Sequence, residues 1–253
     1  MNIAILQARM SSTRLPGKVL MPIVGQPMLA LQIERLRRAK QIDKLVVATS
    51  NQPEDNAIAQ LCQSIGVECY QGSLDNVLDR FYQIASKHCT SNTARTSKSA
   101  NAADSDDHII RLTADCPLAC PIVLDEVVAK HIEQQNDYTT NAVAHSYLDG
   151  LDVEVLTFRA LQLSWQNATT AHEKEHVTPY VIERPQQFSF SHISCEADYS
   201  KHRWTVDYFE DFELVKFVYE SLYSVDNQFS TDDVLQLLAQ HPDIYALNQQ
   251  YVE

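Results

Sequence analysis

The sequence predicts an α/β fold with a mostly parallel central sheet, Rossmann-like, and a small antiparallel excursion. Short apolar runs of strand length alternate with longer segments in which apolar residues recur at helical spacing. That alternation is typical of parallel strands joined by right-handed helical crossovers. Residues 150–158 instead alternate polar and apolar residues, which favours a half-exposed antiparallel strand. A chain of 253 residues with 45% hydrophobic composition can bury one full core, so we expect a single domain over residues 1–253.

The first half of the chain supplies the regular β-α-β rhythm. The first helix carries its cations late, where the helix dipole favours them, and Gly66 is a stop signal for the second. A further helix opens after Gly72, with Ser73 or Asp75 as its cap. We expect strands from Ile3 and at 45–49, 67–70 and 108–113, with helices at 27–39, 56–65 and from 72–81 onward.

The second half is expected to add more helices and shorter strands. Between Cys89 and Asp107 the composition shifts to Ser, Thr, Asn, Ala and Asp without periodic apolar residues, which indicates a flexible insertion at 89–107. The remaining elements are expected as helices at 122–132, 209–223 and 230–238, and as strands at 138–141, 150–158, 188–193 and 203–207.

Composition narrows the classes of partner. A formal charge of −13 and a pI near 5.0 argue against binding to nucleic acid or to an anionic membrane, because both need a basic face. The N-terminus lacks the features of a secretory signal and no run approaches the length of a membrane span, so we expect a cytoplasmic protein. Six scattered cysteines are expected to be reduced and mostly buried.

Against this acidic background, the loop that follows the first strand is cationic. Arg9, Arg14 and Lys18 lie among small hydroxyl residues, with Pro16-Gly17 as a turn signal. Ligands of open α/β sheets sit outside the carboxyl ends of the strands, so this loop is placed to hold an anion such as a triphosphate. It matches neither a Walker A loop nor a dinucleotide fingerprint. An acidic protein that binds a nucleotide also needs help in neutralising the phosphates, which suggests a divalent cation.

The order of residues in this loop closely resembles the nucleotide-binding signature of the sugar-acid cytidylyltransferases. The resemblance implies a nucleotide-diphospho-sugar transferase (GT-A-like) fold and a catalytic role for Arg9, Arg14 and Lys18. The matching string is Ala8-Arg9-x-x-Ser12-x-Arg14-Leu15-Pro16-Gly17-Lys18, of which Ala8, Arg9, Ser12, Arg14 and Lys18 are implied to bind the nucleotide.

Later segments resemble the same family in the same order. Residues 72–81 are similar to a segment of its spore coat polysaccharide branch, which implies that Arg80 shapes the base pocket. Asp115, followed by Pro117, and Asp207 match the family's two metal carboxylates, which implies a Mg²⁺ site. Thr113-Ala114 replaces the more usual Gln-Gly before Asp115.

Four further residues are candidates for substrate contacts. The segment 150–155 resembles the Gly-Leu-Asp-Val-Glu-Val of the spore coat branch, and residues 175–180 resemble its Glu-His-Val-Thr-Pro-Tyr. Arg203 either pairs with a sugar carboxylate or supports Asp207. The candidates are Asp152, Glu154, His176 and Arg203.

Residues 172–176 also spell His-Glu-x-x-His, the zinc motif of metalloproteases. That chemistry needs a helix, and Pro179 is expected to break one here. The segment's resemblance to the spore coat branch therefore takes precedence over a zinc site.

Together the resemblances imply a Mg²⁺-dependent nucleotidyltransferase of surface polysaccharide biosynthesis. It would join CTP and a sugar acid, of nonulosonate or octulosonate type, to give a CMP-sugar and pyrophosphate. A homodimer is also implied, with residues 141–181 as its contact region. Two alternatives remain open: a GT-A-type glycosyltransferase that consumes a nucleotide sugar, and a non-catalytic homologue that binds nucleotide without turnover.

Overall fold

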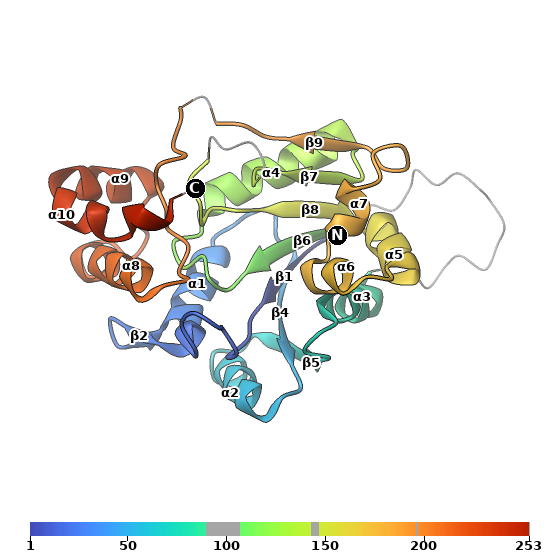
Figure 1. Cartoon of the computed structure of the whole chain (residues 1–253), viewed down its shortest axis with the longest axis horizontal. Helices are drawn as coiled ribbons and strands as arrows, with labels where there is room; N and C mark the ends of the chain where they lie inside the picture. The colour runs from blue at the N-terminus through green and yellow to red at the C-terminus, as the bar shows by residue number, and fades with distance from the viewer. Residues whose placement is uncertain (90–106, 143–146, 196, 253) are drawn as a thin grey trace.

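A seven-stranded sheet is the centre of the computed structural model, which describes residues 1–89, 107–142, 147–195 and 197–252 (Figure 1). The first four strands in the sheet order are mutually parallel, β8 runs antiparallel to both its neighbours, and β9 pairs parallel with β7. This confirms the mostly parallel sheet with a small antiparallel part. The order is β5 (Glu68–Gly72), β4 (Lys44–Ser50), β1 (Asn2–Gln7), β6 (His108–Thr113), β8 (Glu154–Thr157), β7 (Tyr138–Thr140) and β9 (Phe190–His192).

Helices cover both faces of the sheet because its strands are apolar on both sides. Alternate residues of β1 point to opposite faces, so Ala4 and Leu6 join one core cluster while Ile3 and Ile5 join another. The first cluster packs against α1 (Met28–Leu36), α2 (Asn56–Ser64) and α4 (Pro121–Gln134). The second packs against α3 (Val77–His88) and α5 (Phe158–Asn167).

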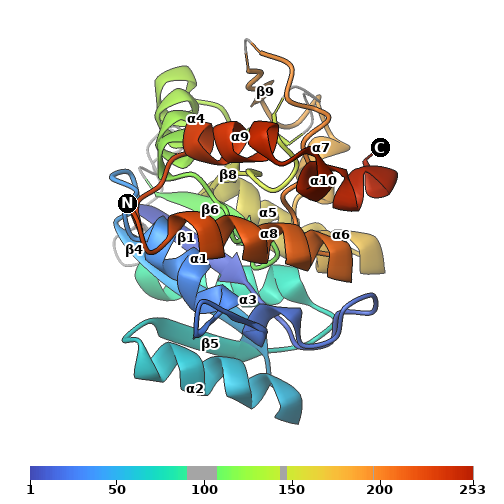
Figure 2. The same ribbon diagram turned by 90° about the vertical axis from the view of Figure 1, so that its left-hand side faces the viewer.

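A third core cluster forms beside the sheet from the C-terminal helices (Figure 2). Buried Trp204 and Val206 join it with Met28 and Leu31 of α1 and with Ile23 of a short hairpin. That hairpin pairs β2 (Pro22–Ile23) with β3 (Gln26–Pro27). The helices are α8 (Phe209–Leu222), α9 (Thr231–Gln240), α10 (Pro242–Tyr245) and the 3-10 helix η4 (Ala246–Tyr251).

Two strand predictions need correction: the strand expected at 203–207 is absent, and the one expected at 150–158 is shorter than predicted. Residues 203–207 form no strand: Trp204 N donates to the carbonyl of Asp149, and Val206 N donates to that of Asp115. Their apolar residues are buried between loops, and the carbonyls of loop residues accept the hydrogen bonds of their backbone N–H groups. The strand expected at 150–158 is only four residues long, and Phe158 instead begins α5, capped by the Thr157 side chain.

The expectation that Pro179 would prevent a helix over residues 172–176 is also wrong. Residues Ala171–His176 do form a helix, α6, which ends at Val177, where φ is 70°. Pro179 then starts a new helix, α7 (Pro179–Ile182), at the position where proline costs no hydrogen bond. Most of the insertion expected at 89–107 lies outside the described residues. Within the described ranges, no helix combines the length and the apolar character that a membrane crossing requires.

Candidate active site

A cleft of about 550 Å³ opens where β1 and β6 end. These strands are adjacent and parallel, so the loops that follow them leave the sheet at the same edge. α6 forms part of the lining. The lining residues are Gln7, Ala8, Arg9, Ser12, Thr13, Arg14, Lys18, Val19, Val77, Arg80, Thr113, Ala114, Asp115, Glu175, His176 and Asp207.

The cationic loop after β1 is held in shape by its own backbone. The Met10 carbonyl accepts hydrogen bonds from Ser12 N and Gly17 N, each at 2.9 Å. Met10 N in turn donates to Asp55 Oδ1 at 2.7 Å. Gly17 has φ of 73°, a left-handed conformation that favours glycine, and the 3-10 helix η1 (Lys18–Leu20) starts directly after it. The loop therefore presents its side chains from a fixed backbone.

Lys18 bridges the two carboxylates that the sequence predicts as metal ligands. Its Nζ donates to Val206 O at 2.6 Å, to Asp207 Oδ1 at 2.9 Å and to Asp115 Oδ2 at 3.3 Å. Burial on its own would lower the pKa of Lys18, but the two carboxylates outweigh it and raise the pKa. The ammonium is therefore firmly charged, and it connects the loop after β1 with Asp207, 189 positions later in the chain.

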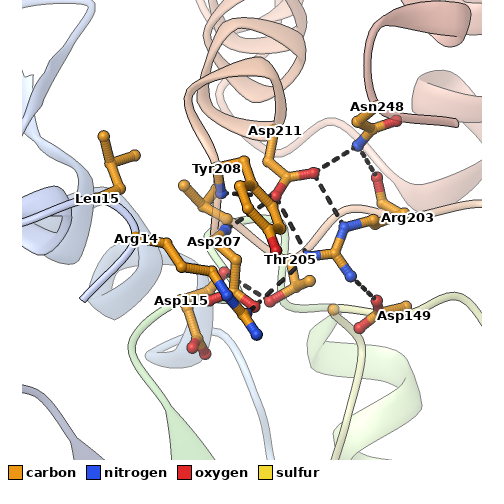
Figure 3. A network of polar contacts seen from close by, with 12 residues as sticks. Arg14, Leu15, Asp115, Asp149, Arg203, Thr205, Asp207, Tyr208, Asp211 and Asn248 are labelled. Atoms are coloured by element: carbon orange, nitrogen blue, oxygen red, sulfur yellow. Dashed lines mark hydrogen bonds and ion pairs between the residues drawn. The ribbon is translucent and has the colours of Figure 1, made fainter. Parts of the chain in front are cut away.

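Asp207 is held from two sides (Figure 3). Its Oδ2 accepts from Arg14 at 2.9 Å, while its backbone N donates to Asp211 Oδ2 at 2.9 Å. Although burial opposes the change, Lys18, Arg14 and Arg203 lower the pKa of Asp207. Asp211 also accepts from Tyr208 N and so serves as the cap of α8. The Asp207 carboxylate is thus not used for helix capping and faces the cleft.

The guanidinium of Arg203 binds neighbouring carboxylates and does not face the cleft. Its Nε and Nη2 donate to the two oxygens of fully buried Asp211, at 3.0 and 3.3 Å. Nη1 donates to Asp149 at 2.7 Å, and Nη2 lies 3.5 Å from Asp207 Oδ2. The side chain does not line the cleft. Of the two sequence-based interpretations, this geometry matches support of Asp207.

Arg80 lines the cleft although it is only 2% exposed. Gly72 makes room for it, since a Cβ there would lie 2.8 Å from Arg80 Cγ. Its Nη1 donates to Ala48 O at 3.3 Å, whereas the buried Nε has no hydrogen-bond partner among the described residues. Burial, with a smaller effect from Arg9, lowers the pKa of Arg80 to about 10. Arg80 thus places a buried positive charge at the wall of the cleft.

Two further predicted substrate residues, like Arg203, lie outside the cleft lining. Glu154 is in the sheet, where it accepts from Tyr138 Oη at 2.6 Å and pairs with Arg111. Asp152 accepts from Gly150 N at 3.4 Å. Burial, together with Asp149, raises the pKa of Asp152 to about 7. These contacts place both carboxylates within the framework beneath the site.

The His-Glu-x-x-His segment lies on α6, at the side of the cleft. His176 and Glu175 line it, and Glu175 Oε1 pairs with Arg9 Nη1 at 3.4 Å. Glu173 is occupied elsewhere: it accepts from Thr170 N at 3.0 Å and pairs with Arg184 at 2.9 Å. In the described ranges, no group of three or more His, Cys, Asp or Glu residues has metal-binding geometry. The motif therefore lacks the free base and third ligand of a zinc protease.

Sequence reasoning missed several residues of this site. Glu175 belongs to two sequence motifs, but neither predicts its contact with Arg9, which depends on tertiary packing. Tyr208 was not singled out, yet its ring lies 5.1 Å from the Arg14 guanidinium. Its position next to Asp207 was the available signal. The other lining residues not predicted for the site are Gln7, Thr13, Val19, Val77, Thr113 and Ala114.

The donor set at Asp115 and Asp207 suits a hard divalent cation. Both carboxylates lie within hydrogen-bond reach of the same ammonium, so their oxygens are close together at the cleft. Mg²⁺ prefers oxygen ligands and commonly uses one or two carboxylates, completing its shell with phosphate and water. The residues present therefore fit an ion that arrives with a nucleotide better than a site built of protein ligands alone.

Comparison with known proteins gives a consistent result. A family model described as cytidylyltransferase matches residues 3–229. The spore coat polysaccharide biosynthesis protein SpsF of Bacillus subtilis is 31% identical over 246 residues, which cover 94% of each protein. The 3-deoxy-manno-octulosonate cytidylyltransferase of Geobacter sulfurreducens is 34% identical over 132 residues, which cover 51% of this chain and 45% of that protein. A solved structure of a cytidylyltransferase from Leptospira borgpetersenii superposes with a TM-score of 0.84 at 30% identity, covering 96% of each chain.

Proposed function

The chain belongs to the cytidylyltransferase family, and from that premise we propose that it joins CTP and a sugar acid to give a CMP-sugar and pyrophosphate. The sugar acid is of the nonulosonate or octulosonate type, and the product serves surface polysaccharide biosynthesis. The reaction uses Mg²⁺. The protein acts in the cytoplasm as a homodimer of a single-domain chain, with residues 141–181 at the contact.

One observation carries the proposal. Lys18, Arg14, Asp115 and Asp207 converge at one wall of a cleft that lies at the carboxyl ends of parallel strands. Cations to hold phosphates and carboxylates to hold a metal ion are thus within reach of one bound nucleotide.

The loop after β1 would bind the triphosphate. Arg9, Arg14 and Lys18 supply positive charge, with Ser12 as a hydroxyl donor, and all four line the cleft. In the reaction, a sugar hydroxyl oxygen forms a bond to the α-phosphorus of CTP while the bond to the pyrophosphate oxygen breaks. Negative charge accumulates on the leaving pyrophosphate, and fixed cations stabilise it without reorganisation.

Asp115 and Asp207 would hold Mg²⁺, which would supply Lewis-acid activation of the phosphate and would lower the pKa of the attacking hydroxyl. Lys18 holds these two carboxylates close together before the nucleotide binds. Arg203, through Asp211, fixes the backbone of Asp207. Its role is therefore support of a ligand rather than contact with the sugar.

The base and the sugar would occupy opposite parts of the cleft. Arg80, which lines the cleft next to Val77, shapes the pocket for the cytosine. The sugar acid lies toward α6, where His176 is exposed at the cleft. Burial lowers the pKa of His176, so the ring is neutral at pH 7 and offers both a donor and an acceptor to sugar hydroxyls. Asp152 and Glu154 act from outside the cleft lining, Glu154 through its pairing with Arg111.

The test measures pyrophosphate release from each of the four nucleoside triphosphates with a panel of sugar acids, with and without Mg²⁺. We expect release with CTP and one sugar acid, dependent on the metal and absent in Lys18→Ala and Asp115→Ala. Release with a different triphosphate would contradict the assignment of CTP. A glycosyltransferase would instead consume a nucleotide sugar and release no pyrophosphate, and a non-catalytic homologue would bind CTP without turnover.

A further inference from the structure

The C-terminal segment of the described chain packs against α8, next to the site. It follows α9, comprises α10 and η4, and ends in the described chain at residue 252 (Figures 1 and 2). The cytidylyltransferase family match ends at residue 229, so the whole segment lies beyond the matched residues. Its contacts with residues near the cleft are therefore not explained by that match.

A buried asparagine anchors the segment. Asn248 is 0% exposed, and its Nδ2 donates at 2.9 Å both to the carbonyl of Arg203 and to Oδ1 of Asp211 (Figure 3). Asp211 is the carboxylate that holds the backbone of Asp207 and Tyr208. The start of α8 and the middle of η4 thus share one hydrogen-bond network, which fixes what η4 presents next.

Tyr251, three residues after this anchor, stacks on Tyr208. The two ring centroids are 3.8 Å apart and the planes differ by 6°. The guanidinium of Arg14 lies 5.1 Å from the centroid of the same Tyr208 ring and donates to Asp207 at 2.9 Å. A close stacking partner limits rotation of the Tyr208 ring, and that ring is the surface on which the cation of Arg14 rests.

We propose that Tyr251 is a positioning residue for Arg14: it holds the Tyr208 ring in place and thereby preorganises the triphosphate side of the cleft. The ligand named here, CTP, rests on the proposed function, whereas the contacts do not. Arg14 is half-exposed, and its long side chain has many rotamers. Ordering this side chain on ligand binding reduces the affinity, unless other residues already restrain it in the free protein. The stack of two tyrosines supplies that restraint from a segment more than two hundred residues away.

The test compares Tyr251→Ala with Tyr251→Phe, which keeps the ring and loses only the hydroxyl that interacts with Glu210. Exposed Gln250 gives a matched control, Gln250→Ala. The dissociation constant of CTP is measured by calorimetry in each variant, and again for Tyr251→Ala combined with Arg14→Ala. In the ligand-free protein, the rate at which phenylglyoxal modifies Arg14 is followed by mass spectrometry of its peptide.

We expect Tyr251→Ala to weaken CTP binding about two- to five-fold, the size of the cation–π contact between Arg14 and Tyr208 that a displaced Tyr208 ring would lose. Tyr251→Phe and Gln250→Ala stay at the wild-type value, and Tyr251→Ala has no added effect once Arg14 is absent. Arg14 is modified faster in Tyr251→Ala alone. An undiminished effect in the Arg14→Ala background, or an unchanged modification rate, overturns the proposal. If the wild type binds no CTP, the proposed function fails, and the modification rate alone decides the role of Tyr251.

Discussion

Replacing Arg203 separates a supporting residue from one that binds substrate. Arg203→Ala removes two donors from Asp211, which is 0% exposed. Breaking a buried ion pair on one side costs about 3–5 kcal/mol, because the remaining charge is uncompensated. Asp211 keeps three donors, from Asp207 N, Tyr208 N and Asn248 Nδ2, so we expect a value at the low end, about 3 kcal/mol.

The expected change in melting temperature follows from chain length. Unfolding entropy of about 2.1 cal/mol/K per residue gives roughly 0.5 kcal/mol per degree for a chain of this size. Arg203→Ala should therefore lower the melting temperature by about 6 °C in differential scanning calorimetry. Arg203→Lys, which restores a charge without the planar fork, should fall between this variant and the wild type.

A matched control is Arg159→Ala. Arg159 pairs with Asp137 at 3.2 Å, but its side chain is 44% exposed. Removal of such a surface pair costs less than about 1 kcal/mol, or about 2 °C here. The reasoning is refuted if Arg203→Ala melts as the control does while its KM for the sugar acid rises, since that pattern belongs to a residue that binds the substrate carboxylate.

Three further predictions concern the site and its framework. Lys18→Ala should lose the CTP-induced thermal shift and about 2 kcal/mol of stability at pH 7. Lys18 depresses the pKa of Asp207, so this stability difference should shrink as the pH falls below about 4, which unfolding at pH 3 and 7 would check. Gly150→Ala should destabilise far more than Gly25→Ala, because both glycines have positive φ but only at Gly150 would a Cβ meet backbone, 2.5 Å from Thr205 N; urea unfolding of the pair measures this. Burial, with His108, lowers the pKa of His131 to about 3, so its contribution to stability is complete above pH 6.5 and falls by up to about 1.4 kcal/mol per pH unit below it. His131→Gln should therefore show a shallower loss of melting temperature between pH 7 and 5, and equal slopes would contradict the assignment.

The parallel half of the fold was predictable because its central strands, β4, β1 and β6, are buried on both faces. Such strands are continuous apolar runs, and the helices between them bear a single apolar stripe, so local sequence specifies both. The segment 203–207 also has buried apolar residues, Trp204 and Val206, but its backbone N–H groups donate to the carbonyls of Asp149 and Asp115 in loops. Local sequence does not distinguish burial between loops from burial in a sheet.

The site was predictable to the extent that its residues lie in a contiguous motif. The loop after β1 and Asp115 follow strand ends, and their convergence at one edge follows from parallel topology. Glu175, Tyr208 and Tyr251 could not be found this way, because each meets the loop through tertiary packing. The same limit applies to Glu154, whose motif suggested a substrate contact but whose partners are Arg111 and Tyr138.

The hydrogen bond from Lys18 to the carbonyl of Val206 spans 188 residues, so it cannot form until most of the chain has been synthesised. During synthesis at about 5–20 residues per second, the ribosome needs roughly 10–40 s to travel from one residue to the other. Throughout that interval the nascent chain contains Lys18 but lacks Val206 and Asp207, two of its hydrogen-bond acceptors. The arrangement of Lys18 between Asp115 and Asp207 therefore forms only late in translation.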